Sequence, residues 1–106
     1  MRRIICRFDD GPAFLNSIDR PSFGAPTLTF LADFPLRDGE LVRTTIIIEA
    51  TGERHDLHLR IQRRAPHLDN GSPGACFRYL ATATDEDTPW LEMLIAKYTT
   101  ARRVTV

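Results

Sequence analysis

The segment 39–66 constrains the fold of this chain more than any other part, and its sequence is GELVRTTIIIEATGERHDLHLRIQRRAP. Apolar residues recur at alternating positions on both sides of a short polar stretch, at Val42, Ile46, Ile48, Leu57, Leu59 and Ile61. Because successive side chains of a strand point to opposite faces, this period of two predicts two antiparallel strands with one face in a core. The residues 50–53 supply the turn, since Gly52 can adopt a positive φ. The segment therefore predicts a half-buried β-hairpin.

Length and composition predict a single globular domain spanning residues 1–106. A chain of 106 residues with 42% hydrophobic and 26% charged residues has the make-up of a soluble globular protein. Its formal net charge of zero excludes the basic excess behind general attraction to nucleic acid or anionic membranes. No segment approaches the roughly 20 apolar residues of a membrane span, and the apolar run 4–6 is too short for a signal peptide. We expect a cytoplasmic protein without a membrane span.

Six strands are expected along the chain. Besides the hairpin, alternating apolar residues predict strands at 2–8, 13–18, 27–33 and 74–81. The turn signal Asp-Asp-Gly-Pro at 9–12 joins the first two of these strands into another hairpin. Two prolines and a glycine make 19–26 a loop. The pattern predicts an all-β fold, as a small antiparallel barrel or a curled sheet.

One helix is predicted at 88–98, near the C-terminus. Thr88 is expected to be its N-cap, with Pro89 at the first helical position. Its apolar residues fall on one stripe, formed by Trp90, Leu91, Leu94, Ile95 and Tyr98. We expect this stripe to cover an open end or edge of the sheet. The residues 99–106 are left open between a last short strand and a frayed tail.

No pattern in the chain predicts catalysis or a metal site. Cys6 and Cys76 lack CxxC spacing and are expected to be free thiols. Neither Cys76 nor Ser72 has an identifiable activating base. A metal site would have to be built from His55, His58 and His67 with Asp56 or Asp69. Since His55 and His58 are three residues apart on a strand, we interpret these histidines as ordinary surface residues.

The densest basic cluster lies at the end of the long hairpin and consists of Arg60, Arg63 and Arg64. Arginine forms bidentate contacts with carboxylates and phosphates, so the cluster is a candidate contact for an acidic partner or a phosphate. The other interpretation is a solvated strand end, balanced by the acidic residues Glu49, Glu53 and Asp56.

The order of these elements resembles the PilZ domain family of bacteria. The resemblance rests on Pro-Leu-x-x-Gly-Glu-Leu-Val at 35–42, the hairpin ending Arg-Ile-Gln-Arg-Arg at 60–64, Gly-Ala-Cys-Phe-Arg-Tyr-Leu at 74–80, and the terminal helix. It implies a six-stranded antiparallel β-barrel with a C-terminal helix.

Many members of that family bind cyclic di-GMP through an RxxxR segment and a DxSxxG turn. Here Arg3 and Arg7 satisfy RxxxR, although they lie in a predicted strand. The nearest match to DxSxxG is the segment 19–24, where Asp19 is present and Ser22 stands one place later than the motif requires. Family members without these motifs are protein-binding adaptors. The resemblance therefore implies a non-catalytic adaptor with a protein partner in motility, pilus or second-messenger pathways.

Two alternatives to the adaptor remain open at this point. The first is a cyclic di-GMP receptor that uses Arg3, Arg7, Asp19 and Ser22 in a non-standard frame. The second is a small β-barrel enzyme or nucleic-acid binder, which the inward positions predicted for most aromatic residues disfavour. The sequence predicts no oligomeric state.

Overall fold

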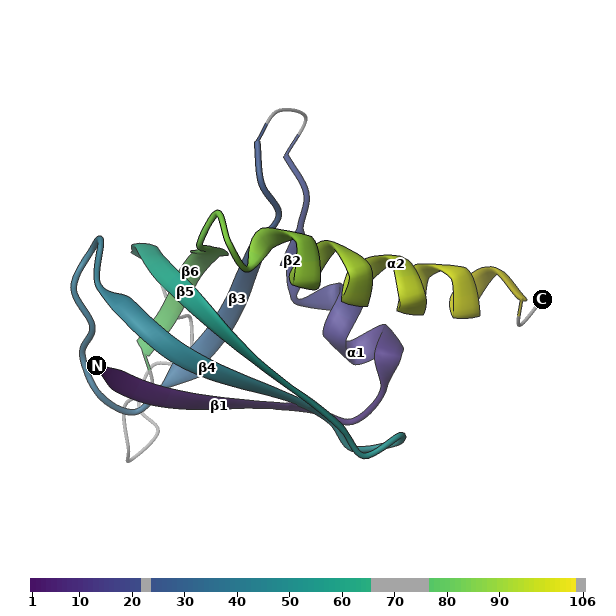
Figure 1. Cartoon of the computed structure of the whole chain (residues 1–106). Helices are drawn as coiled ribbons and strands as arrows, with labels where there is room; N and C mark the ends of the chain where they lie inside the picture. Colours follow the sequence, from purple (N-terminus) through teal and green to yellow (C-terminus); the bar gives the residue numbers. More distant parts are fainter. Residues whose placement is uncertain (22–23, 66–76, 105–106) are drawn as a thin grey trace.

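The structure is a computed structural model that describes residues 1–21, 24–65 and 77–104, with side chains described up to residue 100. Strands and two helices follow one another along these residues (Figure 1). In chain order the elements are β1 (Arg2–Phe8), α1 (Gly11–Asn16), β2 (Ile18–Asp19), β3 (Thr27–Ala32), β4 (Leu41–Ile48), β5 (Glu53–Ala65), β6 (Phe77–Ala83) and α2 (Thr88–Val104).

The strands form one six-stranded sheet in the order β1-β4-β5-β6-β3-β2. β1 pairs with β4 in parallel, whereas all other neighbours in the sheet are antiparallel. Within the described residues β1 and β2 are the two edges of the sheet, and they do not pair with each other. The predicted mostly β fold with six strands and a C-terminal helix is thus confirmed, but the chain also forms helix α1, and the predicted closed antiparallel barrel is wrong. The described sheet is mixed and open.

The long hairpin is present as predicted, in the pairing of β4 with β5. Val42 lies opposite Leu59 and Thr44 lies opposite Leu57, on the face that enters the core. Gly52 in the connecting turn has a φ of 74°, which is the conformation that glycine adopts without strain. β5 continues past the end of β4 and pairs with β6, with an irregularity in register between Ile61 and Arg63.

The predicted strand at 13–18 and its hairpin with β1 are wrong, because the chain forms helix α1 there. The Asp10 side chain accepts a hydrogen bond from the Ala13 backbone N–H at 2.9 Å and so caps the helix. Pro12 stands in the first turn, where its missing N–H costs nothing. The Asp-Gly-Pro signal therefore starts a helix instead of turning a hairpin. Phe14 anchors this helix in the core, where it is fully buried.

Helix α2 starts as predicted at Thr88, but Thr88 is not its N-cap. The Thr88 hydroxyl points back and donates to the Thr84 carbonyl oxygen at 2.8 Å. The Asp87 carbonyl oxygen accepts the first helical hydrogen bond, from the Leu91 N–H. Asp87 therefore precedes the helix, and its carboxylate binds His58 instead of a helical N–H.

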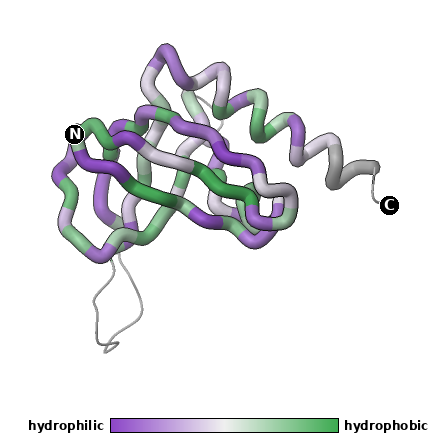
Figure 2. Tube along the Cα trace, turned by 60° about the horizontal axis from the view of Figure 1, so that its bottom comes forward, coloured by the Kyte–Doolittle hydropathy of each residue, from purple (hydrophilic) through white to green (hydrophobic). Residues whose placement is uncertain are grey.

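The apolar side of α2 packs on the sheet, and hydrophobic and hydrophilic positions alternate along this helix (Figure 2). Four of the five stripe residues are buried, namely Leu91, Leu94, Ile95 and Tyr98. The fifth, Trp90, is 61% exposed, so its assignment to the buried stripe is wrong. The helix also continues to Val104, so a strand at 99–104 is excluded. Neither described helix combines the length and apolar character that a membrane crossing requires.

The core lies inside the curl of the sheet, and α1 and α2 pack together at one end of it (Figure 1). The predicted inward aromatics Phe30 and Tyr79 are buried, with ring centroids 5.9 Å apart. The Tyr79 hydroxyl accepts the Leu36 N–H at 2.6 Å and so ties the 33–40 connection to the core. The strand predicted at 74–81 is observed as β6 from Phe77, and its residues 74–76 lie outside the described residues.

Two neighbouring threonines of β4 give a test of this packing. The fully buried Thr44 hydroxyl finds no hydrogen-bond partner in the described structure, whereas the Thr45 hydroxyl donates to Asp56 Oδ1 at 2.6 Å. A buried hydroxyl without a partner is destabilising, so Thr44→Val is expected to raise the free energy of unfolding by about 1 kcal/mol. Thr45→Val is the matched control, and should lower that free energy by about 1 kcal/mol. Chemical denaturation measures both, and a destabilised Thr44→Val variant would contradict the assignment.

Candidate functional site

The two arginines predicted to bind nucleotide lie four residues apart on the outer face of β1. Both side chains are exposed, and Ile5 stands between them. Arg7 Nη1 donates to Glu49 Oε1 at 2.9 Å, in an exposed ion pair. Arg3 forms no ion pair with the residues that the structure describes.

Asp19, the third predicted nucleotide contact, is not brought into one pocket with these arginines. It lies in β2, at the opposite edge of the sheet order from β1. Asp19 lines a hollow of about 530 Å³ that is also lined by Arg63 and Arg78, while Arg7 lines a different hollow. Ser22 lies outside the described residues. The described geometry therefore offers no shared pocket for Asp19 and the arginines of β1.

The predicted partner-binding arginines do not form one patch either. Arg60 donates to the Gly39 carbonyl oxygen at 2.9 Å and lines a hollow with His58 and Asp85. Arg63 lines the separate hollow that contains Asp19. Arg64 lies over the ring of Phe77, with 5.3 Å between its guanidinium carbon and the ring centroid. The register irregularity between Ile61 and Arg63 places Arg60 opposite Thr82 and Arg63 opposite Leu80, so these two arginines share one face of the sheet. Arg64 lies opposite Tyr79 and projects from the other face.

The histidines of β5 each contact a different carboxylate. His55 Nε2 lies 3.2 Å from Glu53 Oε2, and His58 Nδ1 lies 3.0 Å from Asp87 Oδ2. Among the described residues no three His, Cys, Asp or Glu side chains gather in a way that would hold a metal ion. His67 and Asp69 lie outside those residues, as do Ser72 and Cys76.

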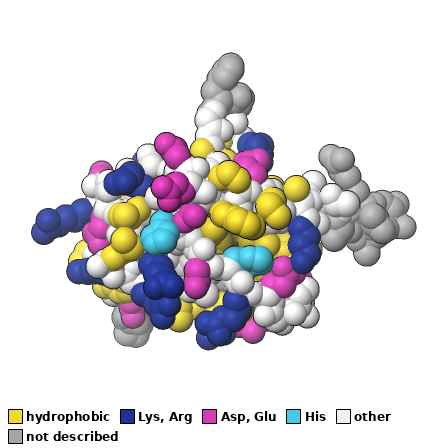
Figure 3. Space-filling model, viewed as in Figure 1, with side chains coloured by type: hydrophobic (Ala, Val, Ile, Leu, Met, Phe, Trp, Pro, Cys, Tyr) yellow, Lys and Arg dark blue, Asp and Glu magenta, His cyan; other side chains and the backbone are white. Residues whose placement is uncertain are grey.

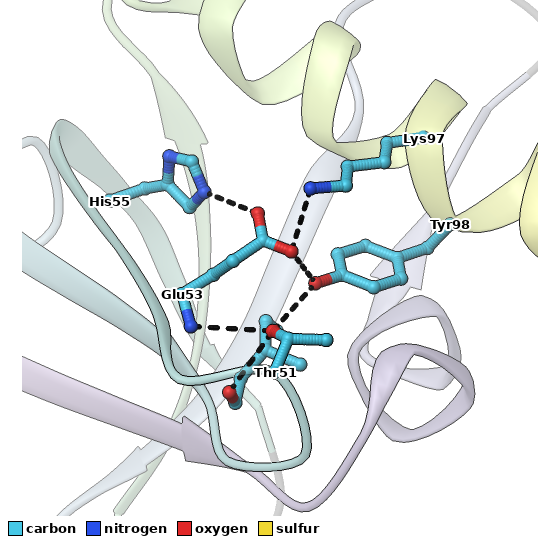
Figure 4. A network of polar contacts seen from close by, with 6 residues as sticks. Thr51, Glu53, His55, Lys97 and Tyr98 are labelled. Carbon is cyan, nitrogen blue, oxygen red and sulfur yellow. Dashed lines mark hydrogen bonds and ion pairs between the residues drawn. The ribbon is translucent and has the colours of Figure 1, made fainter.

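The most connected polar group is Glu53, which the sequence did not single out (Figure 4). Its carboxylate accepts hydrogen bonds from Lys97 Nζ at 2.7 Å and from the Tyr98 hydroxyl at 2.5 Å. These donors, Lys97 first, lower the pKa of Glu53 to about 2. The network joins the turn before β5 to α2, so its chemistry is that of a structural clamp.

The Cys6 thiol is buried in the core, and burial raises its pKa to about 12. A thiol with such a pKa is protonated at neutral pH and is therefore not a nucleophile.

The open seam between β1 and β3 is a feature that the sequence analysis missed. A hollow of about 290 Å³ separates these strands, and its lining includes Ile5 and Phe8 from β1 and Phe30 and Leu31 from β3. Ile5 and Leu31 are 51% and 54% exposed. The predicted hairpin at 2–18 would have covered the edge of β1, so the seam could not be foreseen once that hairpin was assumed.

Exposed apolar side chains also gather on α2. Trp90 and Met93 are each 61% exposed and lie one helical turn apart. Hydrophobic side chains are visible over the first turns of this helix, with charged side chains around them (Figure 3). Large exposed apolar residues that lie side by side are typical of interaction surfaces. The stripe pattern contained Trp90 but did not indicate that it faces outward.

Comparison with known proteins yields neither a matching family model nor a significant match among curated proteins.

The Glu53 clamp predicts a defined dependence of stability on pH. Because the pKa of Glu53 falls from 4.5 in the unfolded chain to about 2 in the folded protein, its ionised form contributes stability that is complete above pH 4.5. That contribution is lost as the pH falls from 4.5 through 2. Glu53→Gln should therefore lower the free energy of unfolding by about 1–2 kcal/mol at pH 7, and the difference from wild type should shrink toward pH 2.

Denaturation curves at pH 7, 4.5, 3 and 2 measure this dependence. Glu49→Gln is the control, because the exposed Glu49–Arg7 pair is expected to contribute less than about 0.5 kcal/mol. An equal loss for Glu53→Gln at pH 2 and pH 7 would show that the clamp does not depend on the ionised carboxylate.

Proposed function

We propose that this chain is a non-catalytic, protein-binding adaptor of a bacterial motility, pilus or second-messenger pathway, acting in the cytoplasm. PilZ membership is part of the proposal and rests on the sequence resemblance. The observation that carries the binding role is the exposure of Trp90 and Met93 on α2. Tryptophan is among the residues that most often dominate binding energy at interfaces, and methionine adapts its shape to a partner.

The surroundings of this pair indicate the chemistry of the partner surface. The exposed acidic residues Asp85 and Glu86 directly precede α2, and neither forms an ion pair within the described part of the chain. Complementary charge steers association and fixes orientation. The partner surface is therefore an apolar pocket for Trp90 and Met93 with basic side chains at its rim.

The alternative activities fit the described residues less well. The carboxylates of Glu53 and Asp87 accept hydrogen bonds from other residues of the chain, which supports a structural role for them. The formal net charge of zero provides no basic excess for general attraction to nucleic acid. Neither observation favours an enzyme or a general nucleic-acid binder.

Paired capture experiments with wild type and variants test the adaptor role. Trp90→Ala/Met93→Ala should lose at least about tenfold in affinity for the partner, because truncating buried interface anchors costs about 2 kcal/mol or more. Thr100→Ala, an exposed change on the same helix, is the matched control and should retain the same proteins. Quantitative mass spectrometry identifies the partner from a bacterial lysate, and calorimetry with the purified partner measures the affinity. Identical captured sets for wild type and the double variant would contradict the proposal.

Cyclic di-GMP binding is the second candidate, supported by the projection of Arg3 and Arg7 from one face of β1. Residues four apart on a strand are separated by about 13 Å, which is wide for two side chains that would hold one compact ligand. We therefore expect calorimetry with cyclic di-GMP, at tens of micromolar protein, to give no saturable heat. Saturable binding that Arg3→Ala abolishes would instead establish the nucleotide receptor.

A further inference from the structure

β1 is an edge strand whose second side is open in the described structure. Its seven residues pair with β4 in one unbroken parallel register, from Arg2 opposite Val42 to Phe8 opposite Ile48. No described strand pairs with its other side. The strand contains no proline and no bulge, which are common means of protecting an edge. Unpaired backbone N–H and C=O groups on such an edge can accept an additional strand.

The space next to this edge is suited to apolar side chains. The hollow of about 290 Å³ between β1 and β3 is lined by Cys6 and Phe8 on one side and Phe30 on the other. Ile5 and Leu31 border it and are exposed. A strand added at β1 would place alternate side chains over this hollow, because successive side chains of a strand point to opposite faces.

The charges of β1 discriminate between possible occupants. In a second copy paired antiparallel about Ile5, Arg3 of each copy would face Arg7 of the other, and like charges directly opposite each other are destabilising. A segment with a carboxylate opposite each arginine gains two favourable pairs instead. The Arg7 guanidinium already binds a carboxylate in this structure, that of Glu49 directly after β4. This Arg7–Glu49 pair is exposed and weak, so a bound segment can replace it.

We propose that the free edge of β1 binds an extended segment of a partner protein. The segment has five consecutive residues, of which the first and last are acidic and the three between them are apolar. The two acidic side chains pair with Arg3 and Arg7, and the central apolar side chain covers Ile5. The remaining two apolar side chains enter the hollow between β1 and β3. The backbone of the segment hydrogen-bonds to β1 and extends the sheet by one strand. This site is separate from Trp90 and Met93, so either surface can fail its test without affecting the other.

Fluorescence anisotropy with a labelled peptide tests the proposal. The peptide Thr-Glu-Val-Leu-Val-Glu-Thr, blocked at both ends, should bind with a Kd of about 10–100 μM and more weakly at high salt. Two control peptides should bind at least about tenfold more weakly. One replaces both glutamates by lysine, and the other is N-methylated at all five central residues, so that it cannot donate backbone hydrogen bonds in either strand direction.

A charge exchange gives the sharper test. Arg3 is exposed, so Arg3→Glu should fold normally, bind the acidic peptide at least about tenfold more weakly and gain affinity for a peptide with lysine at the matching position. Amide chemical shifts of the residues 2–8 should move on titration.

Three results would overturn the proposal. They are equal affinity for the acidic and lysine peptides, no effect of Arg3→Glu, and a stable dimer in solution that Ile5→Glu converts to monomers.

Discussion

Tyr98 of α2 contacts both α1 and the β4–β5 hairpin, which the hydrogen bonds of the sheet do not join to α2. Its ring packs on Phe14 of α1, with 6.1 Å between ring centroids, and lies against Gly11. A Cβ atom at position 11 would stand 2.3 Å from Tyr98 Cδ1, so this approach of the two helices requires glycine. The Tyr98 hydroxyl donates to Glu53, the first residue of β5. One side chain thus fixes α2 to α1 and to the long hairpin.

The topology of the sheet explains why these contacts of Tyr98 are needed. Because β1 runs parallel to β4, the chain must cross over between them, and its path through α1, β2 and β3 leaves the edge of β1 without a neighbour. The sheet curls without closing, and α1 with α2 covers one end of the core. The open seam beside β1 and the outward side of α2 are therefore consequences of one arrangement. The helices α1 and α2 pack against each other at one end of the core. The apolar residues beside β1 and on the outward side of α2 therefore remain exposed.

The sequence predicted the parts of the fold that depend on local pattern. The β4–β5 hairpin has a strong period of two and a glycine at the position that needs positive φ, and α2 has a clear apolar stripe. The segment 13–18 is too short for its period to separate strand from helix, and Asp10 followed by Gly11 and Pro12 is compatible with both a turn and a helix start. The parallel pairing of β1 and the register irregularity that separates Arg64 from Arg60 and Arg63 depend on tertiary contacts. For this reason neither candidate surface was visible in the sequence.

The two surfaces are physically connected through the aromatic residues of the core. Phe8, at the end of β1, meets Phe14 edge to face with ring centroids 5.5 Å apart, and Phe14 in turn contacts Tyr98. Phe8 also lines the hollow beside β1, so a strand added along β1 would lie next to one end of this row of rings. The two ring contacts form a continuous path of packed side chains from β1 to α2. The proposed adaptor would thus carry its two binding surfaces on one packed core, with this row of three aromatic rings between them.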